Sequence, residues 1–225
     1  MRKFIIAIYV LTTLLFIKCA NDNNETVKHH KSVKIDSIFQ TRSIIDSRDG
    51  ERYATVTIGR QTWMAENLRY NAPGSRLNPN NPSSAYGRLY NAKVAQVICP
   101  EGWHLPSDAE WNELEMTLGM NAADTSKTGW RGTHGTHLKS IAGWQSKLKG
   151  SNKSGFNALP AGYYFDGSLG GKIGMDGLGY SVGFWASEKD GISWQRWLAA
   201  PLEGVNRQAD DLSNNHASAC RCVKD

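Results

Sequence analysis

The chain has 225 residues, eight tryptophans, four cysteines and a formal net charge of +5 at pH 7. Three basic residues lie in the first 18 positions, and without that segment 23 basic residues face 21 acidic ones, a charge of +2. The remainder has no Lys/Arg-rich run and no alternation of basic with aromatic residues, which excludes the class of nucleic-acid binders.

The N-terminus has the pattern of an export signal. Arg2 and Lys3 precede an apolar run, residues 4–17, that is too short to cross a bilayer comfortably. Cys19 follows, where a bacterial lipoprotein signal places the cysteine that receives diacylglycerol. A small residue normally precedes that cysteine, whereas this chain has Lys18. We expect Cys19 to be lipidated, and the alternative is an ordinary secreted or membrane-tethered form.

The rest of the chain divides into a polar segment and one domain. Residues 20–45 have no long hydrophobic period and are typical of a flexible tether. The following ~180 residues suffice for one domain that buries about 70% of its unfolded surface. We therefore expect a signal peptide at 1–18, a lipid-anchored tether at 19–45 and a globular domain at 46–225. The expected location is the outer membrane or cell surface, with the lipid anchor as the contact with the membrane.

The first part of the domain predicts a hairpin followed by a long loop. Arg52 to Ile58 alternates and is rich in β-branched residues, so it predicts a strand, and Gln61 to Ala65 follows a Gly-Arg turn as its hairpin partner. Asn71 to Ser84 contains three prolines and four asparagines, which indicates an irregular loop. Asn91 to Val97 is predicted to form a short helix.

The stretch CPEGWHLPSDAEW, from Cys99 to Trp111, predicts a proline-stiffened turn and a capped helix. Ser107 precedes Asp-Ala-Glu110, an S-x-x-E capping box. Trp111 is followed by Leu114 and Leu118 at helical spacing, and Gly119 marks the end of the helix. These residues are interpreted as architectural.

The second half of the domain predicts short strands. A helical turn is expected at 138–141, and strands are expected at 155–164, 182–187, 194–198 and 217–223. A glycine-dense loop is expected from Asp166 to Gly183. Few long helices and many short strands predict an α+β domain with a largely antiparallel sheet.

Three cysteines remain in the domain. An exported chain is in a compartment where disulfides persist. Cys99 can pair with only one of Cys220 and Cys222, and on an extended strand these two point to the same face. The residues themselves leave both pairings open.

Seven blocks in order carry a resemblance to a known family: TVTIGRQTWMAENLRY, GRLYN, CPEGWHLPSDAEW, LKS with GW, GFNALPAGYY, GFWAS and CRCVKD. They closely resemble the Fibrobacter succinogenes major paralogous domain over about residues 46–225. The resemblance implies an exported, often lipid-anchored protein. It also implies pairing of Cys99 with Cys222, because the family's terminal pattern has one cysteine preceded by arginine, so Cys220 is a departure. GWHLPSDAEW further resembles sulfatase-modifying-factor domains, which implies a C-type-lectin-like fold.

Catalytic and metal chemistry has weak support in the sequence. A sulfatase-modifying-factor-type oxidase needs a close pair of free thiols, and C-x-C is not the spacing of that family. His134 and His137 form H-x-x-H without an evident third ligand for zinc. Asp166 and Asp176 are interpreted as part of a polar loop. We expect no cofactor and no metal site, and we favour a protein that is not an enzyme.

Aromatic recognition is the remaining candidate. Trp63, Trp103, Trp111 and Trp185 lie in apolar blocks and are predicted to be core. The candidate ligand-binding residues near polar or glycine-rich turns are Trp130, Trp144, Tyr163, Tyr164, Trp194 and Trp197. Flat aromatic faces beside hydrogen-bonding side chains suit glycans or protein partners. The leading hypothesis is a surface-anchored binding or adhesion module for a glycan, a polysaccharide or a surface protein; the alternatives are the oxidase and a structural envelope protein.

Overall fold

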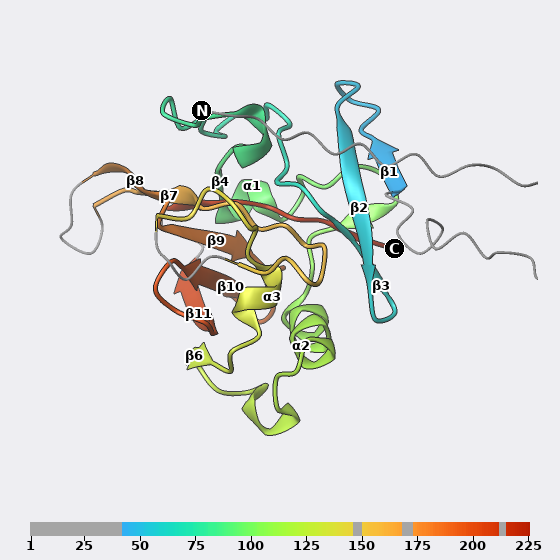
Figure 1. The fold of residues 1–225 in the computed structure, drawn as a ribbon. Coiled ribbons are helices and arrows are strands. Elements are labelled where there is room, and N and C mark those ends of the chain that lie inside the picture. Colours follow the sequence, from blue (N-terminus) through green and yellow to red (C-terminus); the bar gives the residue numbers. More distant parts are fainter. Residues whose placement is uncertain (1–41, 146–149, 168–172, 212–214) are drawn as a thin grey trace, which may run out of the picture. The chain divides into compact units, whose positions relative to one another are not determined.

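A computed structural model describes residues 42–145, 150–167, 173–211 and 215–225 (Figure 1). The expected signal peptide, Cys19 and residues 19–41 of the expected tether lie outside this part. The α-helices are α1 (Ala92–Ala95), α2 (Asp108–Thr117) and α3 (Gly135–Leu138). The strands are β1 (Arg42–Ile45), β2 (Arg52–Ile58), β3 (Gln61–Met64), β4 (Tyr90–Asn91), β5 (Trp103–His104), β6 (Gly129–Arg131), β7 (Ala161–Phe165), β8 (Gly174–Leu178), β9 (Ser181–Trp185), β10 (Ile192–Ala199), β11 (Val205–Asp211), β12 (Ala217–Ser218) and β13 (Val223–Lys224).

The strands form two sheets. The smaller sheet has the order β1-β2-β3-β13-β5, and the larger has the order β4-β12-β7-β9-β10-β11-β6, with β8 paired to β7. The pairing of β7 with β9 is parallel, whereas the other pairings of named strands are antiparallel. The expectation of an α+β domain with a largely antiparallel sheet is confirmed.

The C-terminal segment belongs to both sheets. β12 pairs with β4 and β7 in the larger sheet, and β13 pairs with β3 and β5 in the smaller one. Cys222, immediately before β13, forms the disulfide with Cys99 that the family resemblance implied, with Cα atoms 5.9 Å apart. The end of the chain therefore holds together parts of the domain that are remote in sequence.

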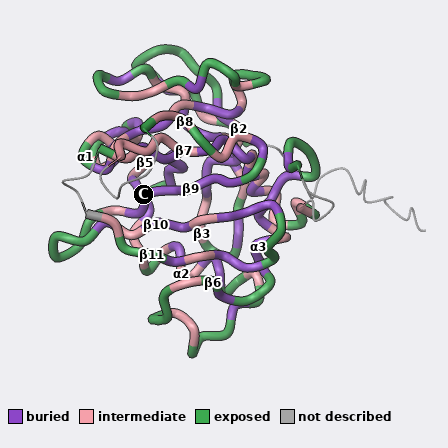
Figure 2. The backbone as a smooth tube through the Cα atoms, turned by 90° about the vertical axis from the view of Figure 1, so that its left-hand side faces the viewer, coloured by how far each residue is buried: buried purple, intermediate pink, exposed green. Residues whose placement is uncertain are grey.

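An aromatic cluster forms the centre of the core. Trp63 and Trp111 have ring centroids 4.8 Å apart, and Phe156 and Phe184 pack edge-on at 5.6 Å. Trp63, Trp111 and Trp185 are buried as predicted, whereas Trp103 is half-buried. Figure 2 shows that the buried positions continue along β9 and β10, while the outer loops are exposed.

Helix α2 begins as the sequence predicts. The Ser107 side chain accepts a hydrogen bond from Glu110 N–H, and the Glu110 carboxylate accepts one from Ser107 N–H. The helix ends at Thr117, and Gly119 follows with φ of 106°, a left-handed conformation that favours glycine. The β2–β3 hairpin and helix α1 are also where the patterns placed them.

The structure differs from the predicted elements at several points. The predicted strand at 155–164 starts only at Ala161, because Gly155 and Asn157 adopt left-handed φ values of 73° and 55°. The helical turn lies at α3 rather than 138–141, because Lys139 forms a parallel bridge with Ala158. Strand β8 lies inside the predicted glycine-dense loop, and residues 42–45 of the expected tether form β1.

Candidate functional site

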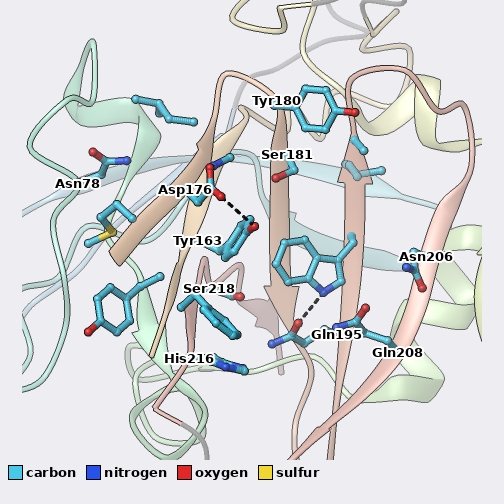
Figure 3. A pocket seen from close by; sticks show the side chains of 18 of the residues that line it. Asn78, Tyr163, Asp176, Tyr180, Ser181, Gln195, Asn206, Gln208, His216 and Ser218 are labelled. Carbon is cyan, nitrogen blue, oxygen red and sulfur yellow. Dashed lines mark hydrogen bonds between the residues drawn. The ribbon is translucent and has the colours of Figure 1, made fainter. Parts of the chain in front are cut away.

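A cleft of about 890 Å³ lies on one face of the larger sheet, over strands β7 to β11 (Figure 3). Its volume is in the upper part of the ~300–1,000 Å³ range of small-molecule sites. Among the described residues, six aromatic ones line it: Trp130, Tyr163, Tyr164, Phe165, Tyr180 and Trp197. Six described side-chain amides also line it: Asn78, Asn80, Gln145, Gln195, Asn206 and Gln208.

Strand register brings two tryptophans into one row. Asn206 on β11 pairs with Trp197 on β10 and also with Trp130 on β6. Residues directly opposite each other on neighbouring strands project from the same face of a sheet. The row of Trp130, Asn206 and Trp197 therefore crosses three strands, and Trp130 is 45% exposed.

Gly183 makes room for the Trp197 indole. Gly183 on β9 pairs with Trp197 on β10. A Cβ atom at Gly183 would lie 2.8 Å from Trp197 Cε2 and 3.0 Å from Ser218 Oγ, closer than non-bonded atoms approach. Because this position has no side chain, the indole lies against the backbone of β9.

Tyr163 completes the aromatic part of the cleft. Its ring packs edge-on against Trp197, with centroids 5.2 Å apart. The Tyr163 hydroxyl donates to Asp176 Oδ2 at 3.5 Å, one of the contacts drawn in Figure 3. Burial, and then the neighbouring Asp176 carboxylate, raise the pKa of Tyr163. The hydroxyl therefore stays protonated and remains a donor at neutral pH.

A chain of polar contacts fixes the other side of the cleft. Trp197 Nε1 donates to Gln195 Oε1 at 2.5 Å, and Gln195 Nε2 donates to Asp210 Oδ2 at 3.1 Å. His216 continues the chain, with Nδ1 3.5 Å from Asp210 and Nε2 3.0 Å from Asp166. These contacts hold the side chains in one orientation before any ligand arrives, which lowers the entropic cost of binding.

The cleft therefore combines two kinds of contact. The aromatic rings offer apolar faces, and the amides and carboxylates around them offer hydrogen-bond donors and acceptors. A sugar ring has matching features, an apolar C–H face and a rim of hydroxyl groups. A hydroxyl-rich ring ligand fits this arrangement.

Four of the six predicted ligand-binding residues line the cleft: Trp130, Tyr163, Tyr164 and Trp197. The other two do not. Trp144 is buried, and its indole N–H donates to Ser140 Oγ and to the Ala158 carbonyl. Trp194 projects from the opposite face of β10, where the Arg207 guanidinium lies 3.3 Å from its ring centroid.

The sequence interpretation missed the polar residues of β10 and β11. In Val205–Asp211 the residues Asn206, Gln208 and Asp210 alternate with Val205 and Arg207. Such alternation predicts a strand with one polar face. It could have revealed the cleft's polar side, and the sequence interpretation placed no strand there.

The three cysteines of the described residues do not form the free pair that an oxidase requires. Cys222 is bonded to Cys99, and the third, Cys220, is fully buried in the core. Burial raises the pKa of the Cys220 thiol, which disfavours the reactive thiolate.

Two further observations concern metals and membranes. Within the described residues, no three His, Cys, Asp or Glu side chains are grouped so that they could hold a metal ion. His134 is buried, and its Nε2 lies 3.0 Å from Glu115 Oε2. Among the same residues, no helix is both long and apolar enough to span a bilayer.

The comparisons with known proteins point to one family. Residues 56–224 match the family model described as Fibrobacter succinogenes major domain, which is most of the chain. Neither the curated proteins nor the solved structures give a match. The matched region begins inside β2 and includes the C-terminal half-cystine, and the chain belongs to the Fibrobacter succinogenes major domain family.

Proposed function

We propose that the domain is a non-enzymatic carbohydrate-binding module. The observation that carries the proposal is the row of Trp130, Asn206 and Trp197 across β6, β11 and β10, inside a cleft whose polar lining is rich in amides. The indoles stack on the C–H faces of sugar rings, and the amides bind their hydroxyl groups. Gly183 and Gln195 keep the Trp197 indole in place for this contact.

The rest of the proposal concerns location and wider likeness. The export signal at 1–18 and a diacylglycerol on Cys19 hold the module at the outer membrane or cell surface, where it meets polysaccharide or a glycosylated surface protein. The C-type-lectin-like fold is part of the same proposal, supported by the GWHLPSDAEW block at the start of α2 and by the largely antiparallel sheets. Mass spectrometry of the membrane fraction tests the lipid, since acylation adds a defined mass to a peptide that begins at Cys19.

The binding test uses retention on insoluble polysaccharides and a glycan array. Trp197→Ala and Trp130→Ala are expected to weaken binding at least tenfold, because each removes an aromatic face from the cleft. Trp194→Ala is the matched control, since it removes an indole from the opposite face of the same sheet. Thermal melting of each variant checks the fold.

Two outcomes contradict the proposal. If the protein binds none of the polysaccharides and none of the glycans on the array, the proposed function is wrong. Equal loss of binding by Trp194→Ala and Trp197→Ala, with unchanged melting temperatures, would show that the cleft is not the binding site.

A further inference from the structure

The cleft carries negative charge on both sides of its aromatic centre. Trp197 lies on β10, and Asp176 lines the cleft from β8 on one side of that strand, while Asp210 lines it from β11 on the other. Figure 3 shows Asp176 beside Tyr163, facing the cleft. A ligand that lies on Trp197 therefore passes between two carboxylates.

The contacts of Asp176 leave its charge in place. Its Oδ1 accepts a hydrogen bond from Gly177 N–H at 2.7 Å, and its Oδ2 accepts one from Tyr163, so both donors are neutral. In the part of the chain that the structure describes, no Lys or Arg forms an ion pair with Asp176 and none lines the cleft. His216 does line the cleft, but it lies between two carboxylates, Asp210 and Asp166, so it does not cancel their combined charge. Arg76 stacks on Tyr164 at 3.8 Å but does not belong to the lining.

These carboxylates strengthen the binding of uncharged glycans and weaken the binding of acidic ones. They accept hydrogen bonds from the hydroxyls of an uncharged sugar, and hydrogen bonds to a charged acceptor are stronger than neutral ones. A uronic acid or a sulfated sugar would bring a second negative charge into a cleft with low-dielectric walls, where repulsion is enhanced. The same groups therefore attract one class of ligand and reject the other.

The row of tryptophans also sets a minimum length for the ligand. The backbones that carry Trp130 and Trp197 flank β11, so they are two strand spacings apart, roughly 10 Å. One sugar ring cannot cover both indoles at that separation. Two or more linked rings can.

We infer that the cleft selects uncharged glycan chains of at least two sugar rings and rejects acidic chains. This inference rests on the proposed glycan binding and adds the chemical class of the ligand.

The test compares two derivatives of one polymer. Whichever of cellulose, xylan, mannan or starch retains the protein is used as its soluble hydroxyethyl and carboxymethyl derivatives, which are similar in size and differ in charge. Affinity electrophoresis of the wild type is expected to show at least tenfold tighter binding to the hydroxyethyl derivative at low salt. The difference is expected to shrink in about 1 M NaCl, where the Debye length is ~3 Å.

A double variant assigns the selectivity to the two carboxylates. Asp176→Asn combined with Asp210→Asn keeps a side-chain oxygen at each position and removes the charge. The double variant is therefore expected to show a smaller difference in affinity between the hydroxyethyl and carboxymethyl derivatives. Competition checks the length: a trimer of the same sugar is expected to compete at least tenfold more strongly than the monosaccharide. Melting temperatures confirm that the variant is folded.

The inference and the proposed function fail in different ways. Equal or tighter binding of the carboxymethyl derivative by the wild type would overturn the inference and leave glycan binding intact. The inference would also be overturned if the double variant kept the full difference in affinity between the two derivatives, or if the monosaccharide competed as strongly as the trimer. Absence of binding to every polymer and to every glycan of the array would instead remove the proposed function.

Discussion

At position 183 the absence of a side chain decides where the neighbouring indole lies. The Trp197 ring occupies the space that a Cβ would fill, and its N–H is oriented by Gln195. A single methyl group added there would change the aromatic floor of the cleft without removing any aromatic residue. This makes Gly183 a sensitive probe of the site.

Gly183→Ala is expected to destabilise the domain by about 1–3 kcal/mol, the usual cost of overpacking, and to displace the Trp197 indole. Urea denaturation measures the first effect, and tryptophan fluorescence reports the second. A double-mutant cycle provides the control, because Gly183→Ala should cost clearly less in a Trp197→Leu background, where the indole is absent. An equal cost in both backgrounds would show that Trp197 is not what the new methyl group meets.

Residues differ in how far the sequence reveals their role. Trp63 and Trp111 lie in apolar blocks, so their burial could be predicted from their neighbours. Arg221 is fully buried, and nothing in CRCVKD indicates it. Its guanidinium donates to Asn67 Oδ1 and to the carbonyls of Met64, Phe156 and Asn157, acceptors that are remote in sequence. Such contacts join residues that are remote in sequence, so no local sequence pattern predicts them.

At the scale of elements, α2 is fixed to the larger sheet by buried charges. Glu115 is fully buried and accepts hydrogen bonds from Arg131 on β6 and Arg196 on β10. Asp108, at the start of the helix, accepts from Arg196 and from Arg207 on β11. These pairs lie on the face of the sheet opposite the cleft. They therefore stabilise the same strands, β6, β10 and β11, that carry cleft residues on the other face.

Glu115→Gln is expected to cost about 3–5 kcal/mol, because it leaves the buried Arg131 guanidinium without its countercharge and leaves Arg196 paired with Asp108 alone. Burial opposes the Glu115 charge, but hydrogen bonds from His134 and the arginines outweigh this effect and lower its pKa. A lowered pKa means that the contribution is present above the unfolded pKa of ~4.3 and is lost as the pH falls through the folded value. Denaturation at pH 7 and pH 3 measures both effects.

The matched control lies on the same helix. Glu113 forms a surface pair with Arg60, which is 87% exposed, so Glu113→Gln should cost within about 0–1 kcal/mol. If Glu115→Gln and Glu113→Gln lower the free energy of unfolding equally, the buried ion pairs of Glu115 do not fix α2 to the sheet.

His104 on β5 forms a pH-dependent contact with the first turn of α2 and with Asp225, which follows β13. His104 Nε2 lies 2.8 Å from Glu110 Oε1, and Nδ1 lies 2.6 Å from Asp225 Oδ1. Burial opposes the charge on His104, but its hydrogen bonds to Asp225 and Glu110 outweigh this and raise its pKa. The stabilisation is therefore complete below the unfolded pKa of ~6.5 and is lost as the pH rises through the folded value.

His104→Gln is expected to lower the melting temperature more at pH 5.5 than at pH 8.5, since the wild type loses the ionic contact at the higher pH. The ring is partly exposed, so solvent screens the effect. His137→Gln serves as the control, because His137 forms no ion pair with the residues that the structure describes. A constant difference across this pH range would contradict the ionic interpretation.

Elements were predictable where a local signal fixed them. The capping box fixed the start of α2, and alternation fixed β2 and β3. β6 has three residues and β8 is glycine-rich, so neither has a strand pattern of its own. β6 becomes a strand by pairing with the longer β11, and β8 becomes one by pairing with β7. The cleft depends on such pairings, so the sequence indicated aromatic residues that line it without showing that they meet. Its polar side had a local signal, the alternation in β11, which the sequence interpretation did not use.

At the scale of the whole domain, the two ends of the described chain contribute unequally. β1 is an edge strand that pairs with β2 and is mostly exposed. Residues 217–224 supply inner strands to both sheets, Arg221 and one half of the disulfide. The disulfide closes a 123-residue separation and contributes about 4–5 kcal/mol on a chain-entropy estimate.

This asymmetry gives opposite expectations for two truncated forms. A form that ends at residue 216 leaves β3, β4, β5 and β7 with backbone groups that have lost their partners, so it should not fold. A form that begins at residue 46 loses one exposed edge and should melt within a few degrees of a form that begins at residue 20. A full-length Cys99→Ala/Cys222→Ala variant removes the disulfide and keeps the strands. It therefore separates the effect of losing the disulfide from the effect of losing the strands. Circular dichroism and size-exclusion chromatography show whether each form is folded. A folded form that ends at residue 216 would mean that the sheets do not depend on the strands, Arg221 and the half-cystine of the C-terminal segment.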